Sequence, residues 1–246
     1  MPIYVGGNAV VAAYVGSTPL SAIYLGDQQV AAFSTDGFGL SAETFRDFAT
    51  RASFWTVDHL FTAADDLCIV GLSFEDHAPA TVKLDPTGDG IIMSEICAVA
   101  GDGRNSNSVL LGVHHFSAQS GIKQIRVDFT APAAGSMAVW TIKGAGRLPT
   151  MGDFASDGDP RAGQLALHLT VAPGEERGIM LGVSTLNGRG ATTPGNIAKV
   201  HGYNNGQGGQ SNAFYRHDGP LRDPEQPSIS YGNARASFAA LKVVPA

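Results

Sequence analysis

Apolar and polar residues alternate along short segments from Phe54 onward, and clusters of Gly, Pro, Asn and Asp separate these segments. The alternation is clearest at 164–171, where large aliphatic residues share one face, and at 125–129, where charged residues occupy the opposite face. This pattern is typical of strands with one buried face. The strands that it predicts are 67–74, 91–99, 108–117, 122–130, 136–143, 164–171, 177–185 and 235–244.

Strands separated by polar turns, without helices between them, predict an all-β fold. The strands are expected to be antiparallel, because parallel neighbours need crossover connections that are usually helical. We therefore predict an antiparallel, jelly-roll-like β-sandwich over residues 37–246. One short amphipathic helix is predicted at 42–51, capped by Ser41 and with Phe45 and Phe48 on one face.

The first thirty residues repeat with a period of ten, and each unit contains Tyr, then Val or Leu, then Gly. Each unit predicts a strand, a Gly-led turn and a second strand. Residues 1–36 contain two acids, Asp27 and Asp36, and no base, so that strand edges are poorly protected against pairing with other copies. A small strand array is marginal in water until something covers it. We predict that 1–36 form a stem or anchor that also drives oligomerisation; the alternative is a three-stranded meander packed on the downstream domain.

The residues expected to carry this oligomerisation and anchoring are the aromatic and aliphatic pairs of the three units. They are Tyr4, Val5, Tyr14, Val15, Tyr24 and Leu25.

Two parts of the chain resemble proteins of known families. The Tyr-Val/Leu-Gly units resemble segments near the starts of tail, fibre and spike proteins of phages and of phage-derived gene transfer agents. Residues 54–185 are similar to the jelly-roll-like sandwich modules of bacterial surface proteins and phage fibres. The segments that carry this second similarity are Asp65–Asp76, Val109–His115, Ile125–Phe129, Met137–Trp140 and Arg177–Val183.

The resemblance implies a virion fibre or head spike, a structural protein that is made in the bacterial cytoplasm and lies on the virion surface. Its N-terminal segment would join other virion proteins, and its sandwich would meet the polysaccharide of the host surface. A homo-oligomer is expected, a trimer on general fibre grounds and a pentamer if the protein sits at a capsid vertex.

Composition narrows the classes of function. The chain has 246 residues, 43% of them hydrophobic and 15% charged, which disfavours disorder. A net charge of −6 disfavours a nucleic-acid partner. No apolar run is long enough to cross a bilayer, and no Lys or Arg precedes Arg46, so neither membrane insertion nor a signal peptide is expected. Cys68 and Cys97 lie in apolar segments and are predicted to be free buried thiols.

The sequence offers little sign of catalysis, metal or cofactor. No G-x-S-x-G elbow is present, and the adjacent His114 and His115 would point to opposite faces of a strand. Acids gather at 75–76, 153–159 and 218–225, but turn acids usually stabilise turns. We therefore expect no enzyme, with a capsule-degrading glycan hydrolase as the alternative. The segment 153–159 is expected to be an acidic loop, since its spacing does not match a twelve-residue calcium loop.

Strand signals thin out between Asn187 and Tyr231, which predicts a long functional loop. Its centre is rich in amides and aromatic side chains, which suit the edges and faces of sugar rings. The alternatives are a flexible loop whose aromatics tuck under the sandwich, and an architectural connector that binds protein. The predicted glycan-binding residues are Tyr203, Asn204, Asn205, Gln207, Tyr215 and Arg216.

Overall fold

The computed structural model describes most of the chain beyond residue 36, together with short strands before it. The described ranges are 37–62, 65–74, 80–84, 91–92, 94–100, 108–115, 121–145, 149–159, 163–187, 192–205, 210–232 and 235–245, and strand segments within 4–32. These residues form strands and one short 3₁₀ turn, so the predicted all-β class is confirmed. No helix of the described residues is long and apolar enough to span a bilayer.

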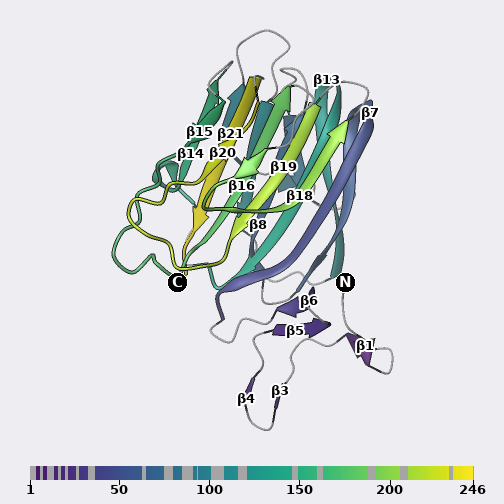
Figure 1. Ribbon diagram of the computed structural model, residues 1–246. Coiled ribbons are helices and arrows are strands. Elements are labelled where there is room, and N and C mark those ends of the chain that lie inside the picture. The colour runs from purple at the N-terminus through teal and green to yellow at the C-terminus, as the bar shows by residue number, and fades with distance from the viewer. Residues whose placement is uncertain are drawn as a thin grey trace.

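The N-terminal repeat forms three two-stranded antiparallel hairpins (Figure 1). In each hairpin the tyrosine pairs with the residue five positions later in the chain. The pairs are Tyr4 with Ala9, Tyr14 with Pro19 and Tyr24 with Gln29. The two strands predicted for each unit are thus confirmed, and the residues between them lie outside the described part of the chain. The strands are β1 (Tyr4–Val5), β2 (Asn8–Ala9), β3 (Tyr14–Val15), β4 (Thr18–Pro19), β5 (Ala22–Leu25) and β6 (Gln28–Ala32).

A first unit of the sandwich contains seven strands hydrogen-bonded into one antiparallel sheet. β13 lies at its centre, with β7 along one side and with β8 and then β9 along the other. The strands are β7 (Gly39–Phe61), β8 (Asp65–Phe74), β9 (Ala80–Leu84), β10 (Ile91–Ile92), β11 (Ser94–Ala100), β12 (Ser108–His115) and β13 (Gly121–Lys143).

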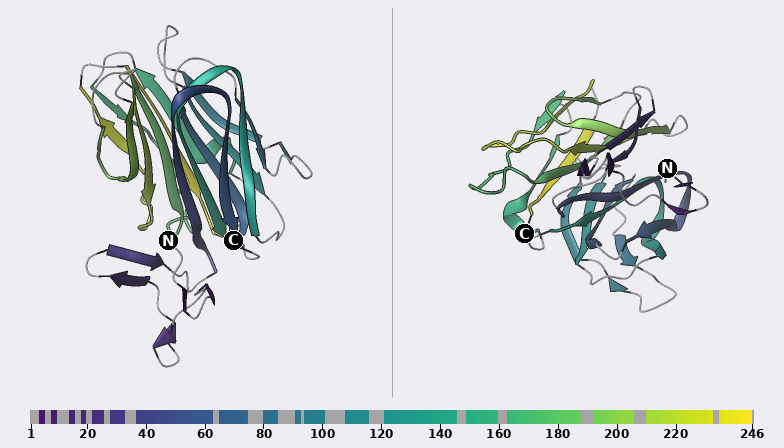
Figure 2. Two further views of the ribbon diagram at one scale, coloured as in Figure 1. Left: turned by 90° about the vertical axis from the view of Figure 1, so that its right-hand side faces the viewer. Right: turned by 90° about the horizontal axis from the view of Figure 1, so that it is seen from below.

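The long strands β7 and β13 bend over together, as the left view of Figure 2 shows for their dark blue and teal ribbons. Their register is irregular between Asp128 and Gly135, where the ladder turns the corner. The bend folds the sheet onto itself and encloses a first apolar core. In this core Phe129, before the bend, packs edge-on against Phe74 of β8 at 5.5 Å between ring centroids. Trp55 Nε1 also donates to Ala133 O at 3.2 Å.

A second unit follows in the chain and contains two further sheets. A five-stranded sheet has the order β14-β21-β16-β19-β18, and a three-stranded sheet has the order β15-β20-β17. The elements are η1 (Met151–Asp153), β14 (Phe154–Asp159), β15 (Gln164–Ala166), β16 (Ile179–Asn187), β17 (Thr193–Pro194), β18 (Ala198–Asn205), β19 (Gln210–His217), β20 (Ser228–Ser230) and β21 (Arg235–Val243).

The two units stack into four β layers with three apolar cores between them. The inner layers are the sheet β7-β13-β8-β12-β11 and the sheet β14-β21-β16-β19-β18, which enclose a second core around Trp140, Leu181 and Phe214. The outer layers are the bent-over part of the first sheet and the sheet β15-β20-β17, which covers a third core. The predicted antiparallel β-sandwich is confirmed, and the strand order of each of its two units is like that of a jelly roll.

The two units also agree in detail. In each inner sheet the first and last strands of the unit are neighbours, and the edge strand carries one irregularity at the same place. It lies between Glu95 and Cys97 in β11, and between Lys199 and His201 in β18. Ser136-Met137-Ala138 of β13 corresponds to residues 237–239 of β21, which read Ser-Phe-Ala. This agreement is typical of an internally duplicated fold.

Two predictions about local structure are wrong. Residues 42–51 belong to β7 and not to a helix, and their two phenylalanines lie on opposite faces: Phe45 packs on the second core and Phe48 on the first. Pairing with β13 along the whole strand outweighs the local helical spacing. The segment 187–231 is not a long loop either, because it contains β17, β18, β19 and β20.

Candidate functional site

The edges of the two inner sheets meet where β7 lies against β18. His201 of β18 donates from Nε2 to Asp47 of β7, at 3.0 Å from Oδ1. The His201 ring stacks on Phe45 with 5.0 Å between centroids and 4° between planes, and Phe214 of β19 lies beside both rings. Aromatic rings thus close the second core at this edge, which we call the β7/β18 edge.

An ion-pair group around Arg216 joins β19 to β7 near the same edge. Arg216 of β19 donates to Glu43 of β7 at 2.7 Å and to Asp218 at 2.6 Å. Burial lowers the pKa of the Arg216 guanidinium, but the attraction of Glu43 and Asp218 outweighs burial, so that its pKa lies above the ordinary value. Arg216 is therefore charged at neutral pH, and its ion pair with Glu43 joins the two sheets.

A chain of buried hydrogen bonds runs from this edge into the interface of the sheets. Ser136 donates to Asp47 at 2.7 Å, and Asn212 donates from Nδ2 to Ser136 at 3.0 Å. Asn212 Oδ1 accepts from Ser73 at 2.8 Å, and Ser73 contacts Thr185 at 2.5 Å. Successive members alternate between the two inner sheets, apart from Ser136 and Asp47. The chain therefore satisfies polar groups that would otherwise be orphaned between two apolar layers.

The Ser136, Asp47 and His201 side chains do not form a nucleophile with its base. In a nucleophilic site the hydroxyl contacts the imidazole, which removes its proton. Here Asp47 stands between Ser136 and His201 and contacts both. The arrangement orients the strands and is a structural hydrogen-bond network.

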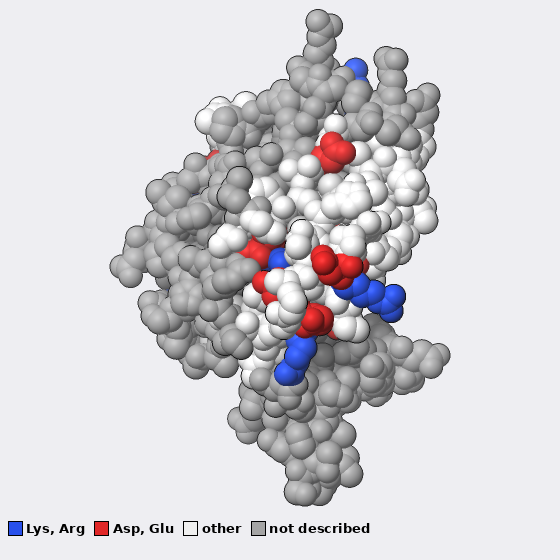
Figure 3. All heavy atoms as spheres, turned by 90° about the vertical axis from the view of Figure 1, so that its left-hand side faces the viewer, with Lys and Arg blue, Asp and Glu red and all other residues white. Residues whose placement is uncertain are grey.

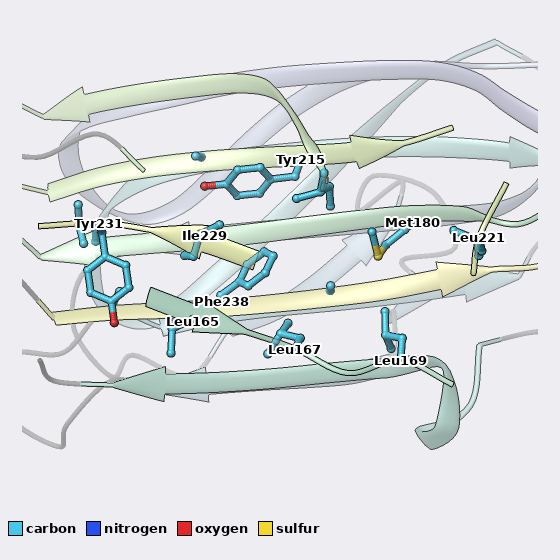
Figure 4. Packing of buried hydrophobic residues seen from close by; sticks show 14 of the residues in the cluster. Leu165, Leu167, Leu169, Met180, Tyr215, Leu221, Ile229, Tyr231 and Phe238 are labelled. Carbon is cyan, nitrogen blue, oxygen red and sulfur yellow. The ribbon is translucent and has the colours of Figure 1, made fainter. Parts of the chain in front are cut away.

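The structure separates the predicted glycan-binding residues. Tyr215 is fully buried in the third core, where Figure 4 shows its ring together with Ile229 and Phe238 between the two sheets. Its hydroxyl contacts Ser184 at 2.8 Å and Thr192 at 2.5 Å. Burial raises the pKa of the Tyr215 phenol above its ordinary value, while the two hydroxyl partners lower it by less. Tyr215 has no surface to offer a sugar, which corrects that part of the prediction.

Arg216 and Tyr203 also lie apart. Arg216 is paired with Ala198, and Tyr203 is paired with Asn212, four residues away along β19. At about 3.3 Å per residue, the two side chains stand roughly 13 Å apart along the strand. Arg216 is moreover engaged by its two acidic partners.

Tyr203 and Asn204 are the predicted residues that the structure leaves near solvent, on the edge strand β18. Tyr203 is half-buried and Asn204 is exposed. The two side chains point to opposite faces of the strand, because successive residues alternate. Asn205 ends β18, its side chain lies outside the described part, and Gln207 lies outside the described residues altogether. The surface candidate is therefore this end of β18.

The predicted acidic loop 153–159 is the turn η1 followed by β14, which corrects the expectation of a loop. Two other predicted acids have structural partners: Asp223 accepts from Val171 N at 3.1 Å, and Glu225 accepts from Asn196 at 2.8 Å. No group of three potential metal ligands occurs among the described residues. Cys68 is a buried thiol, as predicted, and the side chain of Cys97 lies outside the described part.

Charged side chains elsewhere on the surface are mixed in sign. Figure 3 shows the face that lies on the left of Figure 1, where acidic and basic side chains sit side by side in the lower half. Sequence reasoning missed one charged group that is not on the surface at all, the buried Lys242 near Asp153. The sequence did carry an indication of this buried charge, because Lys242 lies within the mostly apolar segment 236–244.

No protein-family model matches the chain, and no curated protein matches it significantly.

Proposed function

We propose that the chain is a structural subunit of a phage or phage-like particle, a fibre or spike that assembles into a homo-oligomer and attaches to host surface glycan. The observation that carries this proposal is the N-terminal array of three hairpins in one register. Each hairpin is a separate two-stranded sheet in the described part of the chain. Such a sheet is marginally stable alone, so association with other copies is its natural source of stability.

The sandwich supports the same role as a rigid body. Three apolar cores lie between its four layers, and polar groups at the central interface form the hydrogen-bond chain through Asn212 and Ser73. A rigid module that presents one weak contact gains from repetition in an oligomer, because each further contact forms at high effective concentration. The glycan contact is assigned to Tyr203 and Asn204 on β18.

Native mass spectrometry of the full chain tests assembly. We expect a trimer, and we expect the triple substitution Tyr4→Ala, Tyr14→Ala and Tyr24→Ala to produce monomers that keep the β-rich circular dichroism of the parent. A parent chain that stays monomeric at micromolar concentration refutes the oligomeric role.

Binding of the full chain to host cells or to purified surface polysaccharide tests adhesion. Tyr203→Ala and Asn204→Ala should each weaken binding, since an aromatic face or an amide pair is lost. His168→Ala is the matched control, because His168 is exposed on the outer layer, away from β18. An oligomer that binds no glycan, or binding that both β18 variants leave intact, would contradict the adhesive role and favour an architectural connector.

A further inference from the structure

Lys242 is a buried amine near the end of the last strand, with 5% of the residue exposed. It lies on the face of β21 that looks toward the third core, opposite Met180. Its Nζ donates to Thr170 O at 2.6 Å and to Glu175 Oε2, and Asp153 Oδ1 lies 3.5 Å away. One nucleophilic side chain thus contacts two carboxylates in an almost dry site.

Hydrogen bonds from nearby residues hold both carboxylates in place. Asp153 Oδ2 accepts from Thr150 N at 2.7 Å and from Thr150 Oγ1 at 2.9 Å, which turns Oδ1 toward Lys242. Two donors on one oxygen also draw electron density from the carboxyl carbon of Asp153. Glu175 Oε2 accepts from Ala172 N at 2.9 Å within a tight turn. The contact between amine and carboxyl groups is therefore pre-oriented.

The first unit of the fold shows that the jelly roll itself does not require these groups. When the two units are matched strand by strand, Thr141 of β13 corresponds to Lys242 of β21. Ala42 pairs with Thr141 and therefore occupies the position that Asp153 has beside Lys242. Thr141 contacts the buried His59 there, at 3.3 Å between Oγ1 and Nε2. Burying an ammonium with its partners carries a large desolvation penalty, which a purely structural position does not explain.

We propose that Lys242 and Asp153 condense to an intramolecular amide, with Glu175 as the catalytic proton carrier. Glu175 takes one proton from the Lys242 ammonium, and the freed lone pair on Nζ forms a bond to Cγ of Asp153. The C–O bond to one carboxyl oxygen then breaks, and that oxygen leaves as water with the proton returned by Glu175 and a second proton from Nζ. An ammonium and a carboxylate are consumed, one amide and one water are formed, and Glu175 ends unchanged; no oxidant or co-reactant is needed.

The bond joins η1, which precedes the first strand of the second unit, to the last strand of that unit. It fixes η1 and β14 to the end of β21, and it closes the whole second jelly roll into a covalent loop. β21 lies between β14 and β16 in the inner sheet, and with the bond in place it could not be pulled out without breaking an amide. This inference does not depend on the glycan or the oligomer of the proposed function.

Intact mass spectrometry of the denatured full chain tests the bond. We expect a mass lower than that of the sequence by one water. Trypsin should then leave a branched peptide in which residues 148–161 are joined to 236–246, because acylated Lys242 is not cleaved. Fragmentation must place the link between Asp153 and Lys242, which separates it from water loss elsewhere.

Variants test the assignment of roles. Lys242→Met and Asp153→Ala should restore the full mass, and Glu175→Gln should do so or slow the loss of water. Asp157→Ala, on the same strand β14 but on an exposed side chain, is the control and should keep the loss. A parent chain that retains its full mass after prolonged incubation at neutral pH overturns the proposal without any variant, and the cluster is then an ion-paired lysine only.

Discussion

Gly71 of β8 lies at a close approach of the two inner sheets. A Cβ at this position would stand 2.6 Å from Cγ2 of Val183 in the opposite sheet and 2.8 Å from Cζ3 of Trp140. Carbon atoms in contact normally stand about 3.5–4.0 Å apart, so Gly71→Ala requires a displacement of about 1 Å. Trp140 and Val183 are fully buried in the second core. Protein interiors are close-packed, so neither side chain can move far without displacing its neighbours.

The magnitude follows from two opposing effects. Overpacking of a tight core costs about 1–3 kcal/mol, and the displacement of two fully buried side chains places Gly71→Ala near the top of that range. Replacing glycine by alanine recovers about 0.4–1 kcal/mol, because the unfolded chain loses freedom. We expect a net loss of about 2 kcal/mol in the free energy of unfolding, or about 4–8 °C in Tm for a chain of this size.

Urea titration followed by tryptophan fluorescence measures this loss, since Trp55 reports the first core and Trp140 the second. Gly202→Ala is the matched control: Gly202 is exposed on β18, and its Cβ would meet Lys199 Cδ at an ordinary 3.6 Å. The control should gain up to about 1 kcal/mol. Equal stability of the two variants would refute the close approach of the sheets at Gly71.

Two further predictions concern buried polar groups. Tyr215→Phe should cost about 1 kcal/mol at pH 8, because Ser184 and Thr192 lose a partner. Folding raises the pKa of Tyr215, so the folded state keeps a proton that the unfolded state releases above pH about 10. The parent therefore loses stability as the pH rises beyond that value. Urea titrations at pH 8 and at pH 10.5 should show a smaller loss of stability between the two pH values for Tyr215→Phe than for the parent. Asn212→Ala should cost about 1–3 kcal/mol in the same assay, because its amide receives a hydrogen bond from Ser73 deep between the sheets. A neutral Asn212→Ala would mean that the buried hydrogen-bond chain adds no stability.

Local patterns predicted the strands whose two faces differ. At 164–171 the alternating aliphatics are all buried and His168 is exposed, as expected. β7 was not predicted as a strand, because its residues pack on two different cores. Phe45 and Phe48, three residues apart, mimic one face of a helix but are needed on opposite faces of a strand that lies between two cores.

The binding prediction failed in part for a related reason. The pattern of 210–217 shows that Tyr215 lies on one face of a strand, but it does not show that the layer β15-β20-β17 covers that face. Arg216 likewise looks free in the sequence, and only the stacking of β7 over β19 supplies Glu43 as its partner.

Local sequence patterns were enough to predict the all-β class, the hairpin repeat and the positions of most strands, because turn chemistry and period-two burial act over about ten residues. The tertiary structure alone decided which strands became neighbours, which faces were covered and which charges met. Asp153 and Lys242 illustrate the difference: Asp153 ends the turn η1 just before β14, Lys242 lies in β21, and their contact arises because β14 and β21 pair. Such pairing depends on contacts between residues far apart in the chain, about which local periodicity carries no information.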